Sequence, residues 1–138
     1  MNDENMRDLA RIRFEKAKEL LGDAESLLEM ESYSSANNRA FYAAERAIKS
    51  VLASIGKDVA SHNGIIRVFN QEFIYERGDY FTQEDLKKLQ GLERIRNASN
   101  YDDFYIASKD ECRDQVYKAK ELIEKVEDFL KEQGILFQ

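Results

Sequence analysis

The chain has 138 residues, and its 27 acidic and 21 basic side chains give a net charge of −6. Hydrophobic residues make up 43% and charged residues 35%, which excludes a disordered chain and predicts a single domain over residues 1–138. No apolar run reaches the roughly 18 residues of a membrane span, and the acidic start is unlike a signal peptide. We therefore expect a cytoplasmic protein without a membrane partner.

The composition also limits the chemistry of the chain. The sequence has no proline and only six glycines, which favours long helices over loop-rich β architectures. The single cysteine, Cys112, excludes an internal disulfide and a cysteine-built zinc site, and the single histidine, His62, cannot hold a metal by itself. We predict no metal and no cofactor. The negative net charge argues against a protein that binds duplex DNA, whereas a local basic pocket could still hold a nucleotide or a short RNA.

Apolar residues that recur with a helical period predict five helices. The first covers residues 3–30. The pattern is then interrupted at residues 33–35, where a serine can cap the second helix. The second helix ends at Gly56, and a shorter third helix starts at Ser61 or Asn63.

Two capping patterns mark the last helices. Thr82 with Asp85 opens the fourth helix, whose apolar residues continue to Ile95. Ser108 with Glu111 opens the fifth, which ends at Gly134. No strand-like alternation competes with this interpretation, so we predict an all-α antiparallel bundle of four to five helices.

Two polar residues interrupt apolar faces. At about 100° per residue, Arg96 points along the apolar stripe of the fourth helix, where an unpaired charge would be costly. It either forms an ion pair with Glu93 or sits at the helix end, or it is held in a groove to meet phosphate. Asn37 lies in the apolar arc of the second helix, where it either bonds to backbone or faces Arg96 across the bundle.

Residues 96–105 read RNASNYDDFY, the strongest local signature in the chain. Asn97, Ser99 and Asn100 favour a helix end or a turn here. The two adjacent aspartates that follow are a poor metal site, because neighbours on a loop rarely converge on one ion. We therefore expect an ordered loop at this point.

Three blocks of sequence carry a resemblance to a known family. They are ANNRAFYAAERAIKSVL at residues 36–52, SHNGIIRVFNQEF at residues 61–73 and LERIRNASNYDDFY at residues 92–105. In order and spacing they resemble the stand-alone prokaryotic proteins of the HEPN domain family (higher eukaryotes and prokaryotes nucleotide-binding) over residues 8–132. The resemblance implies a compact bundle of four or five helices.

The resemblance also implies binding residues. Arg96 matches the family arginine, and Asn97 matches the asparagine that often follows it. Together with Asn37 and Asn100 they are the candidate nucleotide- or RNA-binding residues. Many prokaryotic relatives pair with a minimal nucleotidyltransferase in toxin–antitoxin systems, so the resemblance implies such a partner for this chain.

Catalytic members of the family are metal-independent ribonucleases that use the arginine and a histidine a few residues later. Arg96 and Tyr101 occupy these two positions here. A tyrosine keeps its proton at pH 7 and is a poor general base. We therefore expect a ribonuclease motif that departs from the catalytic pattern because its histidine is replaced. His62 could substitute from the preceding helix. The alternatives to a binding partner are an active ribonuclease toxin and a purely structural helical oligomer.

The fourth helix further suggests a homodimer. Its inward arc mixes Leu86, Leu89 and Leu92 with Glu93 and Arg96, which suits a partly polar interface. We expect two-fold symmetry to bring both copies of Arg96 towards one groove.

Overall fold

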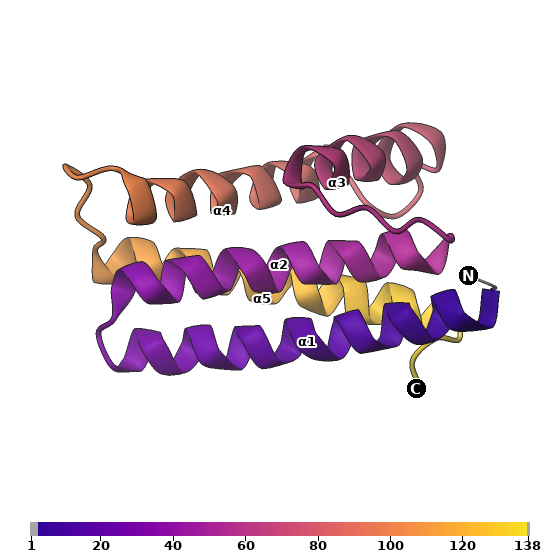
Figure 1. Ribbon diagram of the computed structural model, residues 1–138, viewed down its shortest axis with the longest axis horizontal. Helices are drawn as coiled ribbons and strands as arrows, with labels where there is room; N and C mark the ends of the chain where they lie inside the picture. The colour runs from indigo at the N-terminus through magenta and orange to yellow at the C-terminus, as the bar shows by residue number, and fades with distance from the viewer. Residues whose placement is uncertain (1–2, 138) are drawn as a thin grey trace.

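The computed structural model describes residues 3–137, and all regular structure in that range is helical (Figure 1). The prediction of an all-α bundle is confirmed. None of the helices in this range combines the length and apolar content needed to cross a bilayer. The elements are α1 (Asp3–Glu29), α2 (Tyr33–Ser54), α3 (His62–Phe69), the π-helix η1 (Asn70–Glu76), α4 (Gln83–Tyr101) and α5 (Lys109–Glu132).

Helix α2 is the centre of the bundle. It runs alongside α1, with α5 behind it and with α3 and α4 across its remaining side (Figure 1). Small side chains allow this crowding, because alanine adds little bulk between packed helices. The fully buried alanines of α2 are Ala36, Ala40, Ala43, Ala44, Ala47 and Ala53. The neighbouring helices can therefore approach α2 closely.

The turn between α1 and α2 lies slightly earlier than predicted. Ser34 and Ser35 already belong to α2, and Ser32 occupies the cap position without a side-chain hydrogen bond to the helix. The reversal takes place at Glu31, whose φ of 62° lies in the left-handed region. A backbone conformation of this kind leaves no mark on the apolar pattern, which explains the shift.

The predicted caps of the later helices are largely confirmed. Ser61 accepts a hydrogen bond from the backbone N–H of Gly64 at 3.0 Å, and Ser108 accepts one from Glu111 at 3.1 Å. The carboxylate of Asp85 accepts the backbone N–H of Thr82 at 2.8 Å. These contacts satisfy N–H groups that have no partner within the helix.

The third predicted helix changes its period midway. α3 is followed without a break by η1, whose wider turn is a local departure from α-helical geometry. Phe73 of η1 thereby joins a cluster of rings, with centroids 5.9 Å from Phe69, 5.8 Å from Phe81 and 5.6 Å from Phe129. The ring cluster fixes α3 and η1 against the ends of α4 and α5.

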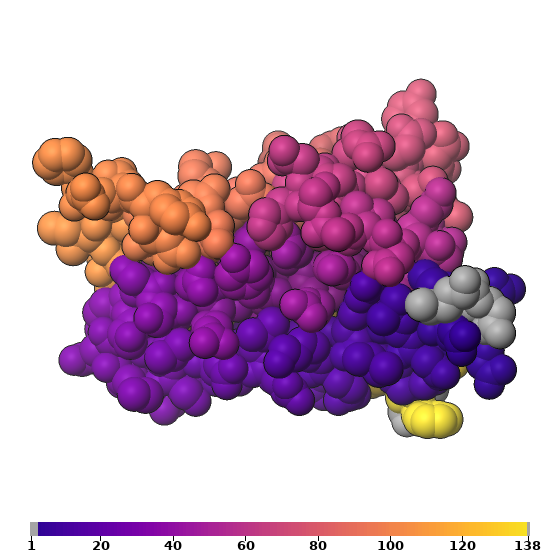
Figure 2. All heavy atoms as spheres, in the orientation of Figure 1, coloured from indigo at the N-terminus to yellow at the C-terminus, as the bar shows by residue number. Residues whose placement is uncertain are grey.

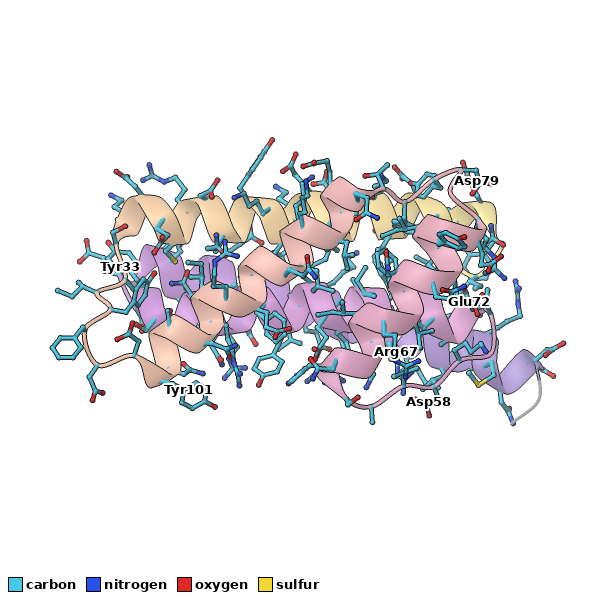
Figure 3. The ribbon with its side chains drawn as sticks, turned by 90° about the horizontal axis from the view of Figure 1, so that it is seen from above. Tyr33, Asp58, Arg67, Glu72, Asp79 and Tyr101 are labelled. Carbon is cyan, nitrogen blue, oxygen red and sulfur yellow. The ribbon has the colours of Figure 1, made fainter. Side chains whose placement is uncertain are left out.

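Helix α4 continues further than predicted. The expected end near residue 96 is wrong, because Asn97, Ser99 and Asn100 lie on its last turns and the helix stops at Tyr101. Ser99 and Asn100 bond to Asn37 and Asn38 of α2, and Asn97 accepts from Arg96. These side chains therefore do not need to turn back onto their own backbone. The extension places the whole candidate site on helical backbone, and Tyr101 marks its end in Figure 3.

Candidate functional site

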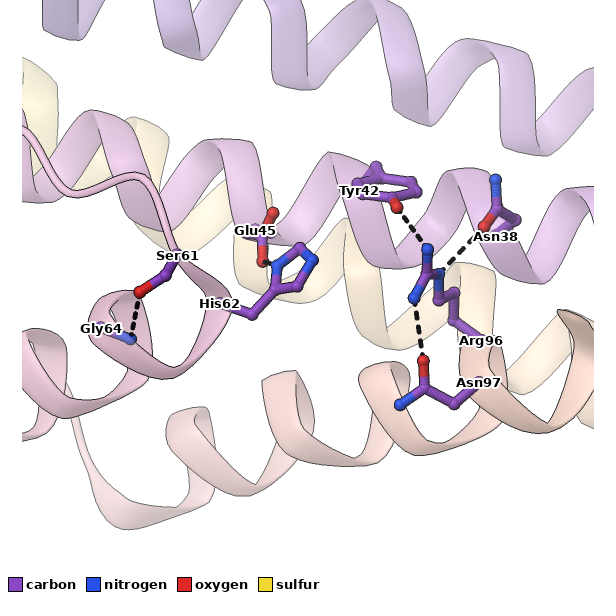
Figure 4. A network of polar contacts seen from close by, with 8 residues as sticks. All are labelled: Asn38, Tyr42, Glu45, Ser61, His62, Gly64, Arg96 and Asn97. Carbon is purple, nitrogen blue, oxygen red and sulfur yellow. Dashed lines mark hydrogen bonds and ion pairs between the residues drawn. The ribbon is translucent and has the colours of Figure 1, made fainter. Parts of the chain in front are cut away.

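The candidate site is centred on Arg96, where the last turns of α4 lie against α2. Its guanidinium donates three hydrogen bonds: Nε to Asn38 Oδ1 at 3.2 Å, Nη1 to Asn97 Oδ1 at 2.9 Å and Nη2 to the Tyr42 hydroxyl at 2.5 Å (Figure 4). All three acceptors are neutral. The side chain is half-buried, so the group is fixed in direction but still reaches solvent.

Aromatic rings surround the guanidinium. Its Cζ lies 5.1 Å from the ring centroid of Tyr42, 5.5 Å from that of Tyr101 and 5.9 Å from that of Phe41. The negative faces of such rings attract a cation, most strongly where water is partly excluded. Tyr101, at the motif's histidine position, is 72% exposed and therefore offers a free ring surface beside Arg96.

The structural explanation of Arg96 as an ion pair with Glu93 is wrong. Arg96 has no carboxylate within ion-pair distance in residues 3–137, and Oε2 of Glu93 is buried without a hydrogen-bond partner there. The protein groups that contact the positive charge of Arg96 are therefore neutral oxygens and aromatic rings. Such a group keeps its capacity to bind an anion.

The predicted asparagines fall into two groups. Asn97 and Asn100 are exposed at the site, and Asn100 donates to Asn38 Oδ1 at 3.0 Å. Asn37 does not meet Arg96. It is 1% exposed and donates to Ser99 Oγ at 3.2 Å, while its neighbour Asn38 takes the expected place against the guanidinium. Asn37 thus holds α2 to α4 from the inside. Asn38 and Tyr42 are contacts of Arg96 that were not predicted from the sequence.

A second feature is the pair of His62 and Glu45. Nδ1 of His62 donates to Oε2 of Glu45, and the imidazole centroid lies 6.4 Å from the ring centroid of Tyr42 (Figure 4). Tyr42 therefore separates the imidazole from Arg96 in one row of side chains. Glu45 is largely buried, whereas the His62 side chain is 44% exposed, which leaves Nε2 open to solvent.

The sequence alone does not place His62 in this row. Its position after the Ser61 cap was visible, but the packing of α3 onto α2 was not. Glu45 gave one signal, since it is an acidic residue within the buried arc of α2 and is only 9% exposed. A buried carboxylate needs a partner, and the only histidine of the chain supplies it.

The loop after α4 adds a tyrosine that stays protonated. Burial and a hydrogen bond to Glu111 raise the pKa of Tyr105 to about 12. The phenol is therefore neutral at physiological pH and cannot act as a base there. Residues 3–137 hold no group of three or more His, Cys, Asp or Glu side chains arranged for a metal ion.

Two hollows flank the row of side chains. One, of about 250 Å³, lies beside the Arg96 contacts and is lined by Leu27, Ser34, Ser35, Asn38, Arg39 and Asn100. The other, of about 420 Å³, lies between α3 and α4 and is lined by Asn63, Ile66, Gln90, Glu93 and Arg94. Figure 3 shows how α4 crosses obliquely and diverges from α3. The first hollow adjoins the Arg96 contacts through Asn38 and Asn100, and the second reaches the same stretch of α4 through Glu93.

Comparisons with known proteins agree with this fold. The sequence model of the HEPN domain matches residues 10–129. A UPF0332 protein of Thermotoga maritima is 26% identical over 117 residues, which is 85% of this chain and 87% of that protein. A UPF0332 protein of Archaeoglobus fulgidus is 32% identical over 103 residues, which is 75% of this chain and 80% of that protein.

A solved structure shows the same arrangement of helices. The crystal structure of TT1696 from Thermus thermophilus superposes with a TM-score of 0.70 at 24% sequence identity. The match covers 86% of this chain and 96% of that one. At this sequence identity, the structural similarity is evidence for a shared fold.

Proposed function

The chain belongs to the HEPN domain family, and from this premise we propose that it contacts a nucleotide or RNA through Arg96, as one member of a nucleotidyltransferase/HEPN pair of the toxin–antitoxin type. The observation that supports the binding role is the state of Arg96. A half-buried guanidinium is held in one direction by three neutral acceptors, with no carboxylate to neutralise it. Its planar donor fork matches the geometry of phosphate oxygens.

The surrounding groups suit a nucleotide. Tyr101 offers an exposed ring for stacking of a base, and Asn97 and Asn100 offer amide donors and acceptors next to the phosphate position. The hollow of about 250 Å³ beside Asn38 gives room for part of the ligand. The protein partner is inferred from the family resemblance. Purification of the chain from its native host with identification of bound proteins tests it, and recovery without any nucleotidyltransferase contradicts the pairing.

The binding role predicts a specific effect of Arg96→Ala. Nucleotide or short-RNA binding should weaken by about 1.5–3 kcal/mol, the scale of a hydrogen bond to a charged group. The melting temperature should change little or rise, because no carboxylate is left unpaired. Titration calorimetry and thermal denaturation of the same samples measure both. Arg113→Ala, on the exposed surface of α5, is the control and should bind as wild type. A large loss of stability without loss of binding would make Arg96 structural.

The His62–Glu45 pair supports a second candidate, a metal-independent ribonuclease. Glu45 binds Nδ1 of His62 and so leaves Nε2 to exchange a proton, on the far side of Tyr42 from Arg96. An imidazole there could take the proton of a ribose 2′-hydroxyl whose phosphate lies at the arginine. In this candidate His62 replaces the histidine that the motif lacks at Tyr101.

Cleavage of labelled single-stranded RNA in the presence of a chelator separates the two candidates. The binding role predicts slow or no cleavage by the wild type, and Tyr101→His, which restores the motif spacing, should leave that rate unchanged or raise it. Robust wild-type cleavage that Arg96→Ala and His62→Gln both abolish would establish the ribonuclease. Cleavage that survives both substitutions would come from a contaminant.

A further inference from the structure

A group of cations lies along the surface of α2 beyond the Arg96 site. Arg46 and Lys49 follow Tyr42 by four and seven residues, so the three side chains share one face of the helix. Arg13 of α1 faces the same region, where it forms a 2.6 Å ion pair with Asp58. We call Arg13, Arg46 and Lys49 the cationic cluster. Figure 2 shows how the helices lie on one face of the molecule, with α2 between α1 below and α3 and α4 above.

Within the cationic cluster, Arg13 is neutralised by its ion pair with Asp58. Asp58 is engaged by Arg13 and Glu45 by His62, so within residues 3–137 neither Arg46 nor Lys49 has an ion-pair partner. Partial burial, then Arg13 and Arg46, lower the pKa of Lys49, and the nearby carboxylates of Asp58 and Glu45 offset only part of this shift. The remaining cations repel one another, although the chain as a whole has a net charge of −6. A bound polyanion would relieve this repulsion, so the cluster indicates a surface for such a ligand.

We propose that the cationic cluster binds the backbone of single-stranded RNA while Arg96 holds a neighbouring phosphate of the same strand. This inference rests on the proposed role of Arg96. The axial rise of a helix places Arg46 about 6 Å and Lys49 about 10 Å beyond Tyr42, which itself touches Arg96. Successive phosphates of an extended strand can therefore lie beside Arg96, Arg46 and Lys49 in turn.

The aromatic side chains favour a nucleic acid over an acidic peptide. Tyr101 exposes 72% of its surface beside Arg96, and the ring of Tyr42 lies between Arg96 and the cationic cluster. Bases of a single strand can stack on such rings, whereas the paired bases of a duplex cannot. A strand of several nucleotides can therefore use the Arg96 site and the cationic cluster together, whereas a free nucleotide reaches only the Arg96 site.

The test measures how affinity depends on strand length. Fluorescence anisotropy is recorded with labelled oligouridylates of one, two and four nucleotides, carrying 2′-O-methyl groups so that they cannot be cleaved. Each added phosphate contact should tighten binding by about tenfold. The double variant Arg46→Gln/Lys49→Gln should bind the mononucleotide as wild type and lose the gain with length. Its plot of log affinity against log salt should be less steep by about 1.4, for two lost phosphate contacts.

The control variant is Lys87→Gln/Lys120→Gln, which removes the same charge from exposed positions on α4 and α5 and should keep the length dependence. Affinity that does not rise with length overturns the inference and leaves the Arg96 site intact. Failure to bind even the mononucleotide overturns the proposed function as well. Oligoglutamate or duplex RNA that binds the cationic cluster as tightly as single-stranded RNA of equal charge also overturns the inference.

Discussion

The Cys112 thiol shows how burial controls the reactivity of a single residue. It is fully buried on α5, and this burial raises its pKa to about 11. Because the thiolate is the reactive form, a raised pKa keeps the group protonated and inert at neutral pH. We expect a thiol reagent at pH 8 to label the native protein at least about 100-fold more slowly than the protein in denaturant. Equal rates in the two states would show an accessible thiol.

At the residue scale, the sequence identifies Arg96 but not its partners. Arg96 stands out because a cation lies in an apolar stripe, and such a contrast is visible in one helix. The choice between Asn37 and Asn38 is different, because neighbours lie about 100° apart around a helix and the rotation of α2 in the bundle decides which one meets α4. The same holds for His62, whose partner Glu45 comes from another helix. Contacts between elements depend on docking, which no single-helix pattern encodes.

At the element scale, the start of α3 depends on Gly64. A Cβ at this position would lie 2.7 Å from Ser61 Oγ and 2.9 Å from Val59 Cγ1, so Gly64→Ala must displace the cap. We expect a loss of about 1 kcal/mol or more in the free energy of unfolding, as for a lost N-cap. Urea denaturation measures it.

Gly22→Ala is the matched control for that experiment. Gly22 lies within α1, and a Cβ there has no neighbour within 4 Å. Alanine should stabilise this helix by about 0.5–1 kcal/mol, because glycine loses more backbone entropy on folding. If Gly64→Ala is as stable as wild type, the Ser61 cap does not hold the start of α3.

Elements that the sequence predicted correctly have local causes. Short-range sequence patterns keep their predicted roles in the structure. Examples are the caps at Ser61 and Ser108 and the glycine that follows α2. The length of α4 and the π-helix η1 have tertiary causes. Asn37 and Asn38 stabilise the last turns of α4, and the ring cluster favours the wider turn at Phe73. Neither contact is available to a segment considered alone.

At the scale of the whole molecule, the structure changes the basis of the expected homodimer. Leu86, Leu89 and Leu92 were expected to contribute to an interface, but they are at most 6% exposed and belong to the core of the single chain. The exposed apolar side chains lie elsewhere, with Phe104 95% and Ile106 87% exposed on the loop after α4. Exposed apolar side chains that lie close together in one loop, as these two do, are candidates for an interaction surface.

We therefore expect a homodimer that uses this loop, where a two-fold contact would pair each ring with its copy. Light scattering at tens of micromolar should give twice the 16.1 kDa of the chain. Phe104→Ser/Ile106→Ser should shift the mass to that of a monomer with little change in stability, because neither side chain is part of the core. Tyr75→Ser, which alters a 79% exposed ring on η1, is the control and should remain dimeric. A monomeric wild type contradicts the homodimer, and a dimer that survives the double substitution places its interface on another surface.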